Sequence, residues 1–562
     1  MDLNWCICLA LCISVSAGFV WKHHNNEELP VILEEIHEKC PNITRVYALT
    51  EPSVLNVPLY VIEFSDNPGF HQPYKPEVKY VGNIHGNEVL GRELLLGLAD
   101  YLCDRYNQFD KRIRALIHTT RIHLLPSMNP DGWQAAYDVG GRDYLIGRAN
   151  NHSVDLNRNF PDLDAITFEL ERQGISHNNH LLQDLSRLTA PDCQKTLEPE
   201  TRAVMRWIMS IPFVLSAALH GGDLVANYPY DESRSGAPTS EYSASPDDET
   251  FRELALTYAM AHEDMASTKR KGCDIDGDTD SDSYNFGKQG GVTNGAAWYS
   301  LKGGMQDFNY LATNAFEITL ELGCLKFPPA SSLSREWERN KEALLAYMFK
   351  AHIGVKGIVS DDSGFIQNAI ISVVNITGSI PRPIRHDITT GPFGDYYRLL
   401  TPGHYEVTAS FPGYFPISRV ITVPPYQMSA LIVDFKLEFY LCRYNFKRKA
   451  HWKAHLSWVE SRKLRSAFLS TVPRRQKTKI FNHCVLPTTP KNDGRQVYRP
   501  KKHMRARQST ILKGSPVNKV WHERILMGTE VKDIALKLDW RSRLVQSNIL
   551  FESVEDPVRK VF

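Results

Sequence analysis

The chain has 562 residues, and its 65 Lys and Arg nearly balance 64 Asp and Glu, for a formal net charge of +1 at pH 7. This length exceeds one ordinary hydrophobic core and therefore predicts two or more domains. The charge is unevenly distributed, because Lys and Arg outnumber Asp and Glu by about three to one over residues 438–562. The rest of the chain is therefore acidic. This distribution gives no reason to expect a nucleic-acid partner.

The chain begins with an apolar stretch that is typical of a secretory signal peptide. Residues 3–15 are apolar and end in Val15-Ser16-Ala17 before Gly18, a small-x-small cleavage pattern, although Asp2 stands where a basic residue is usual. The alternative is a buried N-terminal helix. No later apolar run is long enough to cross a bilayer, so we expect a product without a transmembrane segment, in the extracellular space or the lumen of the secretory pathway.

Helix-like and strand-like segments alternate over residues 18–351. The helix-like segments are Glu27–Glu38, Arg92–Arg105, Pro199–Met209, Thr250–Met265 and Ser334–Lys350. The strand-like segments are Pro58–Phe64, Val78–Ile84, Arg121–Leu125, Phe213–Leu219 and Phe316–Leu322. This alternation predicts an α/β domain with a mixed central sheet flanked by helices.

Two of these strands end close to residues that bind metals. His85 and Glu88 follow the strand at 78–84 with the spacing His-x-x-Glu, and His220 follows the strand at 213–219. Two His and one carboxylate with an open fourth position are the ligand set of a catalytic zinc. The spacing His-x-x-Glu alone is a weak signal, and His220 strengthens it.

Short strand-like segments follow the α/β region. Val355–Val359, Ala369–Val374, Tyr396–Leu400, His404–Ser410 and Ile417–Val423 are β-rich and separated by Gly and Pro. Strands at this spacing predict a small β-sandwich over residues 352–437. Beyond it, residues 438–562 have scattered aromatics and few apolar runs, which favours a basic, mostly disordered tail.

Ordered sequence blocks over residues 40–330 resemble the zinc metallocarboxypeptidases, specifically the regulatory branch with carboxypeptidases N, E, M and D. These blocks are GNIHGNEVLGRELL, LLPSMNPDGW, IGRANN, VDLNRNFPDLD, ALHGGDLVANYPYD, GGMQDFNYL and FEITLELGC. The segment GDYYRLLTPGHYEVTASFPGY resembles the transthyretin-like domain that follows the catalytic domain in this branch. The resemblance implies a catalytic domain over 18–351 and a transthyretin-like domain over 352–437, with a structural or docking role for the latter.

The resemblance implies one Zn²⁺ held by His85, Glu88 and His220. Glu321 matches the family's general base, and its apolar flanks suit a carboxylate whose pKa is raised. Glu317, on the same strand, fits a structural ion pair better. Arg148 matches the residue that polarises the scissile carbonyl.

Substrate recognition is implied in the same way. Arg158 matches the anchor of the C-terminal carboxylate, with Asn157 beside it, because a guanidinium binds carboxylates bidentately. Tyr299 matches the mobile tyrosine that closes over substrate. Asp231, with Gln306 as the second pocket position, favours a Lys or Arg side chain, since burying a cation without a partner is unfavourable. Arg92 we interpret as structural. The implied activity is release of C-terminal Lys or Arg from peptides and proteins.

Secretion permits disulfides and glycans. The resemblance pairs Cys40 with Cys103 and Cys273 with Cys324, and it leaves Cys193 odd. N-glycosylation acceptor sequences begin at Asn42, Asn151 and Asn375.

Three alternatives remain open at this point. A non-catalytic binding protein is one, although every expected site residue is present. The acidic loop 274–282 has alternating carboxylates but fails the EF-hand pattern, so it is interpreted as solvated. The basic tail suits heparin-like glycans or an anionic membrane surface, or it is an extension without a partner.

Overall fold

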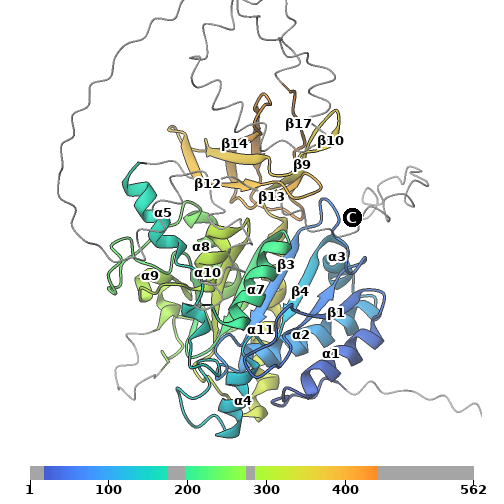
Figure 1. Ribbon diagram of the computed structural model, residues 1–562, viewed down its shortest axis with the longest axis vertical. Helices are drawn as coiled ribbons and strands as arrows, with labels where there is room; N and C mark the ends of the chain where they lie inside the picture. Colours follow the sequence, from blue (N-terminus) through green and yellow to red (C-terminus); the bar gives the residue numbers. More distant parts are fainter. Residues whose placement is uncertain (1–17, 175–196, 274–284, 440–562) are drawn as a thin grey trace, which may run out of the picture. The chain divides into compact units, whose positions relative to one another are not determined.

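The computed structural model describes residues 18–174, 197–273 and 285–439, which all belong to one compact unit (Figure 1). The expected signal peptide, Cys193, the acidic loop and residues 440–562 of the expected tail lie outside the described residues.

A mixed eight-stranded sheet forms the centre of the first region. In spatial order its strands are β1 (Thr44–Ala48), β2 (Tyr60–Phe64), β4 (Arg121–Leu125), β3 (Glu77–Gly82), β5 (Phe213–His220), β8 (Phe316–Leu322), β6 (Leu224–Tyr228) and β7 (Val292–Asn294). Strands β4, β3, β5 and β8 run parallel, whereas the pairs β1–β2, β2–β4 and β6–β8 are antiparallel. The predicted α/β fold with a mixed central sheet is confirmed.

Helices cover both faces of this sheet (Figure 1). Every residue of β3, β5 and β8 is buried, which requires cover on both sides, because successive side chains of a strand point to opposite faces. The helices are α1 (Glu28–Lys39), α2 (Leu90–Asn107), α3 (Lys111–Thr119), α4 (Pro130–Asp138), α5 (Leu163–Arg172), α7 (Pro199–Ser210), α8 (Asp248–Ala261), α9 (Gly295–Trp298), α10 (Met305–Ala312) and α11 (Ala330–Phe349).

Two predicted boundaries were wrong for local reasons. The strand predicted to Ile84 ends at Gly82, because Asn83 takes a positive φ of 59° and turns the chain. The helix predicted to Met265 ends at Ala261, because His262 is extended and its Nδ1 accepts the N–H groups of Asp264 and Met265. These two hydrogen bonds belong to the turn that follows the helix.

The parallel order of β3, β5 and β8 gathers three expected site residues at one edge of the sheet. Their carboxyl ends meet there, as ligand-binding edges do in open α/β sheets. His220 at the end of β5 is in register with Glu321 on β8, and the segment after β3 carries His85.

The second region consists of two small sheets around their own core. One contains β9 (Val355–Asp361), β10 (Gly364–Phe365), β13 (Asp395–Arg398), β16 (Leu431–Ile432) and β17 (Phe435–Lys436). The other has the order β12 (Arg382–Thr389), β11 (Ile370–Asn375), β14 (Gly403–Ser410) and β15 (Ile417–Val423). Alternate residues of β14 are buried, so its sheet turns one face inward. The expected β-rich domain is confirmed.

A buried ion pair joins the two regions. Arg398 on β13 lies 2.7 Å from Asp247, with both side chains fully buried. The other oxygen of Asp247 accepts a hydrogen bond of 2.9 Å from Tyr310 on α10. The Tyr310 ring in turn stacks on His386 of β12 with a centroid distance of 3.7 Å. The β-rich region therefore contacts α10 directly.

His71 forms a second link between these regions. Its Nδ1 lies 2.6 Å from Glu77 of β3, and its Nε2 lies 2.9 Å from Asp395 of β13. Burial lowers the pKa of His71, but the two carboxylates outweigh burial and raise it to about 9. The charged imidazolium therefore holds one carboxylate from each region.

The described cysteines form both expected disulfides, Cys40–Cys103 and Cys273–Cys324. Asn42 and Asn151 are exposed, whereas Asn375 is only 8% exposed and is poorly placed to carry a glycan. Among the helices of the described residues, none has the length and apolar character needed to cross a membrane.

Candidate active site

The segment between β3 and α2 is shaped by two small features. The Asn83 amide donates hydrogen bonds to the carbonyls of His85, Gly86 and Glu88, at 3.0, 2.9 and 3.2 Å. Gly86 has no room for a side chain, because a Cβ there would lie 2.1 Å from the carbonyl carbon of Gly132. The tight turn directs His85 and Glu88 to the same side.

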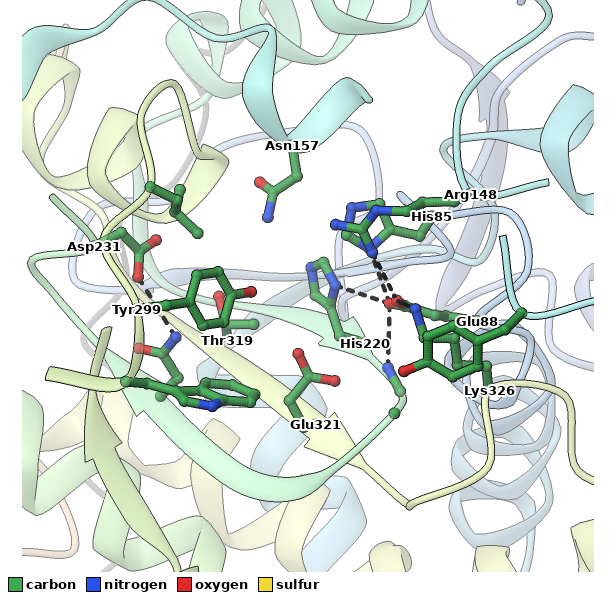
Figure 2. A pocket seen from close by; sticks show the side chains of 16 residues that line it. His85, Glu88, Arg148, Asn157, His220, Asp231, Tyr299, Thr319, Glu321 and Lys326 are labelled. Atoms are coloured by element: carbon green, nitrogen blue, oxygen red, sulfur yellow. Dashed lines mark hydrogen bonds and ion pairs between the residues drawn. The ribbon is translucent and has the colours of Figure 1, made fainter. Parts of the chain in front are cut away.

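His85, Glu88 and His220 form a buried cluster (Figure 2). The Nδ1 atoms of His85 and His220 lie 3.0 and 2.9 Å from Oε2 of Glu88, and the two rings are 4.8 Å apart. One ligand atom from each residue falls within 4.8 Å of the others, and two imidazoles with one carboxylate are a zinc donor set. The three predicted ligands therefore come together in an arrangement that fits Zn²⁺.

Asp155 supports this cluster from outside it. Its Oδ1 lies 3.0 Å from Nε2 of His85, and its Oδ2 accepts a hydrogen bond of 3.1 Å from Arg148 Nε. A carboxylate on the far nitrogen of a ligating histidine fixes the ring's orientation and tautomer. The sequence analysis did not single out Asp155, although it lies within the block VDLNRNF.

Two glutamates on β8 have different surroundings. Glu317 accepts from Lys79 Nζ at 2.9 Å, and both side chains are fully buried, so its interpretation as a structural ion pair is supported. Glu321 is 8% exposed, and its Oε2 has no hydrogen-bond partner among the described residues. Burial, followed by the charges of Glu88 and Asp223, raises the pKa of Glu321 well above its usual value. Glu321 is thus suited to accept a proton.

A pocket of about 200 Å³ extends from this cluster to Asp231. In Figure 2, Asp231 lies on the opposite side from Glu88, with His220, Tyr299 and Glu321 between them. The pocket volume suits a single side chain and its backbone, not a folded segment. Its two ends therefore differ in chemistry, metal ligands at one and a lone carboxylate at the other.

Asp231 is 3% exposed, and the uncharged amide side chains of Gln306 and Asn227 lie beside it. Gln306 Nε2 donates to its Oδ1 at 2.9 Å, as the pairing of these two predicted residues requires, and Asn227 is 3.5 Å away. Burial raises the pKa of Asp231 to about 7, although Arg158 opposes this effect. A cationic side chain entering the pocket would supply the charge that Asp231 lacks.

The other expected substrate-binding residues are placed unequally. Asn157 lines the pocket, and its Oδ1 accepts from the N–H of Met305 at 2.9 Å. Tyr299 and Arg148 also line it. Arg158 is exposed, donates to the carbonyl of Asn157 at 2.9 Å, and is not among the pocket-lining residues, so its role as carboxylate anchor stays a prediction.

Tyr144 and Lys326 are among the pocket-lining residues that the sequence analysis did not single out. Lys326 Nζ lies 3.3 Å from Oε1 of Glu88 and 4.1 Å from the ring centroid of Tyr144. Both residues stand on the side of the pocket away from Asp231. Lys326 follows the block FEITLELGC by one residue, which was the available signal.

Arg92 is structural, as interpreted from the sequence. Its side chain is fully buried, hydrogen-bonds to Asn26 and to the carbonyl of His24, and lies over the ring of Trp133.

Comparisons with known proteins agree with this geometry. A family model described as zinc carboxypeptidase matches residues 30–343, and one described as a carboxypeptidase regulatory-like domain matches residues 354–438. The carboxypeptidase N catalytic chain of Mus musculus is 48% identical over 427 residues, 74% of this chain and 86% of that protein. Carboxypeptidase E of Caenorhabditis elegans is 48% identical over 424 residues, with coverage of 74% and 87%. Carboxypeptidase Z of Homo sapiens is 44% identical over 421 residues, with coverage of 74% and 61%.

Proposed function

We propose, from the premise that this chain belongs to the zinc carboxypeptidase family and is a metallocarboxypeptidase with one Zn²⁺ in its catalytic domain, that it removes C-terminal Lys or Arg from peptides and proteins in the secretory pathway or outside the cell. The observation that carries the proposal is the buried Asp231 carboxylate at the end of the pocket opposite the His85, Glu88 and His220 cluster.

His85, Glu88 and His220 would hold the metal, and His85 would keep its orientation through Asp155. When bound, zinc supplies Lewis-acid chemistry that polarises a carbonyl and lowers the pKa of a water molecule.

Glu321 would move the proton in this mechanism. Its Oε2, which has no hydrogen-bond partner within the described part of the chain, would accept a proton from the attacking water and return it to the nitrogen of the leaving residue. Arg148, which lines the pocket beside the metal cluster, would stabilise the negative charge that develops on the scissile carbonyl oxygen.

Recognition of a free C-terminus would come from Arg158 and Asn157, with Tyr299 closing over the substrate. Asn157 already lines the pocket, whereas the exposed Arg158 side chain has to turn inward to bind the carboxylate. Tyr299 is 41% exposed, which leaves its side chain room to move.

Asp231 and Gln306 would select the departing side chain. A lysine or arginine in the pocket places its charge near a carboxylate whose hydrogen-bonding side-chain neighbours, among the described residues, are the amides of Gln306 and Asn227. An apolar side chain would instead leave Asp231 buried without a counter-charge, which is unfavourable.

The experiment that tests the proposal uses four peptides that differ only at their C-terminus. One ends in Arg, one in Lys, one in Leu, and the fourth in Arg with an amidated carboxylate. We expect release of Arg and Lys, little release of Leu and none from the amide, with activity lost on chelation and restored by Zn²⁺. Equal release of Leu and Arg would reject the basic specificity but not the family's chemistry.

We also propose the domain division 1–17, 18–351, 352–437 and 438–562, with a signal peptide first and a basic tail last. Two hydrophobic cores support the middle boundary, since all buried residues of the second lie beyond residue 352 and, among the described residues, only the buried Tyr397 and Leu399 from that region join the first. The polybasic clusters of the tail, such as Lys447-Arg448-Lys449 and Lys501-Lys502, suit sulfated glycans or an anionic membrane surface. A chain ending at Leu437 should keep its activity on small peptides and elute from heparin at lower salt than the full chain. Equal elution would reject glycan binding by the tail.

A further inference from the structure

A second group of acidic side chains lies close to the specificity end of the pocket. One carboxylate oxygen from each of Asp162, Asp164 and Glu232 falls within 4.8 Å of the others. Asp162 caps α5 and accepts from the N–H of Ala165, Asp164 lies in the first turn of that helix, and Glu232 directly follows Asp231. Two segments distant in sequence thus bring three carboxylates together.

The two most buried members of this acidic cluster each keep one oxygen atom without a hydrogen-bond partner among the described residues. Asp164 is 4% exposed and Glu232 is 1% exposed. Asp164 Oδ1 and Glu232 Oε2 are buried atoms with no hydrogen-bond partner within the described part of the chain. Burial raises the pKa of Asp164 well above its usual value and that of Glu232 to about 7. Buried carboxylates of this kind require a cation or a proton.

Lys302 supplies part of the missing positive charge. Its Nζ lies 2.7 Å from Oε1 of Glu232 and 3.8 Å from Oδ2 of Asp162, and its side chain is 53% exposed. One ammonium faces three carboxylates, and no ion pair joins it to Asp164 among the described residues. The half-exposed Lys302 side chain is also free to swing into solvent when another cation enters.

We propose that Asp162, Asp164 and Glu232 bind a calcium ion at a site distinct from the His85, Glu88 and His220 cluster. The donors are all oxygens, which suits a hard cation and disfavours zinc, whose usual ligands include nitrogen or sulfur. Ligands of one Ca²⁺ lie at about 2.3–2.6 Å, so oxygens up to about 5 Å apart can share it, whereas Mg²⁺ at about 2.0–2.1 Å needs a tighter octahedron. The observed spread of the three oxygens is one that Ca²⁺ can bridge once the Lys302 ammonium has moved away.

The site is joined to the floor of the pocket. The N–H of Asp231 donates to Oδ2 of Asp307 at 2.6 Å, and Asp307 interacts with Asp164. A bound ion would therefore fix the segment that carries Asp231. Calcium binding itself does not depend on the proposed function, because the acidic cluster contains no residue of the catalytic machinery.

Calcium titration of the full zinc-loaded chain tests this proposal. The measurements are the melting temperature with and without Ca²⁺, and calorimetric stoichiometry with Mg²⁺ as the comparison ion. Asp164→Asn and Glu232→Gln each remove one ligand charge with little change of shape, and Glu338→Gln, on the exposed face of α11, is the control. Lys302→Gln removes the competing ammonium.

We expect one Ca²⁺ per chain at this cluster and a rise of a few degrees in the wild-type melting temperature. The two amide variants should bind at least about tenfold more weakly, as loss of one charged ligand implies, while Glu338→Gln matches wild type. Lys302→Gln should bind Ca²⁺ more tightly. An equal calcium response in wild type, Asp164→Asn and Glu232→Gln would overturn the proposal and place the ion elsewhere, for example at residues 274–282. If the wild-type protein showed no response to Ca²⁺, the proposal would also be overturned, and the three carboxylates would be interpreted as a group that shares a proton.

Discussion

The pocket and the contact with the β-rich region both bury charged side chains, but the two regions differ in whether those charges are paired. At the contact, Arg398 is paired with Asp247, and His71 bridges Glu77 and Asp395. In the pocket, Glu321 Oε2 has no partner among the described residues. Removing one partner of a buried pair leaves a lone charge and destabilises the fold, whereas a buried carboxylate oxygen without a partner is free to meet substrate or a proton. Substitutions in the pocket should therefore affect catalysis, and substitutions at the contact should affect stability.

The largest expected effect is that of Glu321→Gln. Loss of the proton acceptor should lower kcat by about 10²–10⁴-fold while zinc content stays at one per chain. The melting temperature should stay equal or rise, because the variant removes a buried carboxylate whose Oε2 has no partner among the described residues. Steady-state kinetics, metal analysis and thermal unfolding check the three parts. Near-normal turnover would show that Glu321 is not the base.

Glu317→Gln is the matched control on the same strand. It leaves the Lys79 ammonium buried without its carboxylate, so the free energy of unfolding should fall by about 3–5 kcal/mol. Turnover per folded molecule should remain close to normal. Comparison of these two variants, four residues apart on β8, then distinguishes a loss of turnover from a loss of stability.

Asp231→Ala should have the next largest effect, on specificity. The kcat/KM ratio for Arg-ending over Leu-ending peptides should fall by about two to three orders of magnitude, because a buried cation loses its carboxylate. The paired assay on wild type and variant measures this ratio directly. A ratio unchanged by the substitution would remove Asp231 from the pocket floor.

Arg398→Met tests the contact between the α/β region and the β-rich region. Asp247 would remain buried without its counter-charge, so the free energy of unfolding should fall by about 3–5 kcal/mol, with kcat per folded molecule near the wild-type value. Arg398→Met combined with Asp247→Asn should recover most of the loss, because no lone charge remains. Denaturant unfolding of the three variants checks the expectation. An Arg398→Met protein as stable as wild type would contradict this prediction.

Acidic pH should weaken specificity in the same sense as Asp231→Ala. The pKa of Asp231 is raised to about 7, so below that pH the carboxyl group becomes neutral. The Arg-to-Leu ratio of kcat/KM should be full above pH 7 and fall by up to about tenfold per unit below it. Using a ratio cancels the pH dependence of the metal and the base, which both substrates share. A flat ratio down to pH 5 would contradict the assignment.

The smallest predicted effect concerns His71 and has the opposite pH dependence. Its pKa is raised in the folded protein from 6.5 to about 9, so the stabilisation is complete below pH 6.5 and is lost as pH rises through 9. The loss should be on the order of 2–3 kcal/mol in free energy of unfolding. His71→Gln should abolish this part of the pH dependence. Unfolding curves at pH 6 and 9.5 for both proteins provide the measurement.

The sequence predicted the elements whose patterns are strong and local. The strands Arg121–Leu125, Phe316–Leu322 and Ile417–Val423 have the predicted bounds, because each is rich in β-branched or apolar residues. Strand β12 was missed, because it contains Pro383 and only two apolar aliphatic residues among polar ones. Its residues form a strand through pairing with β11, which is a tertiary effect.

The site residues also fall into those that the sequence predicted and those that it did not. Asp231 and Gln306 were both predicted from family-like blocks, and the structure brings them within hydrogen-bonding distance. Asp155 and Lys326 could not be assigned, because their roles depend on distances across the fold to His85 and Glu88. Spacing along the chain gives no information on such contacts.

Helix α10 carries Gln306 at one end and Tyr310 one turn later, where Tyr310 touches both Asp247 and His386. The β-rich region is therefore not an interchangeable module. A chimaera that replaced residues 352–437 with another β-sandwich would need an arginine in the place of Arg398 and a ring in the place of His386 to keep α10 seated. Substitutions that disturb Tyr310 at this contact are therefore expected to shift α10, the helix that also carries Gln306 beside Asp231.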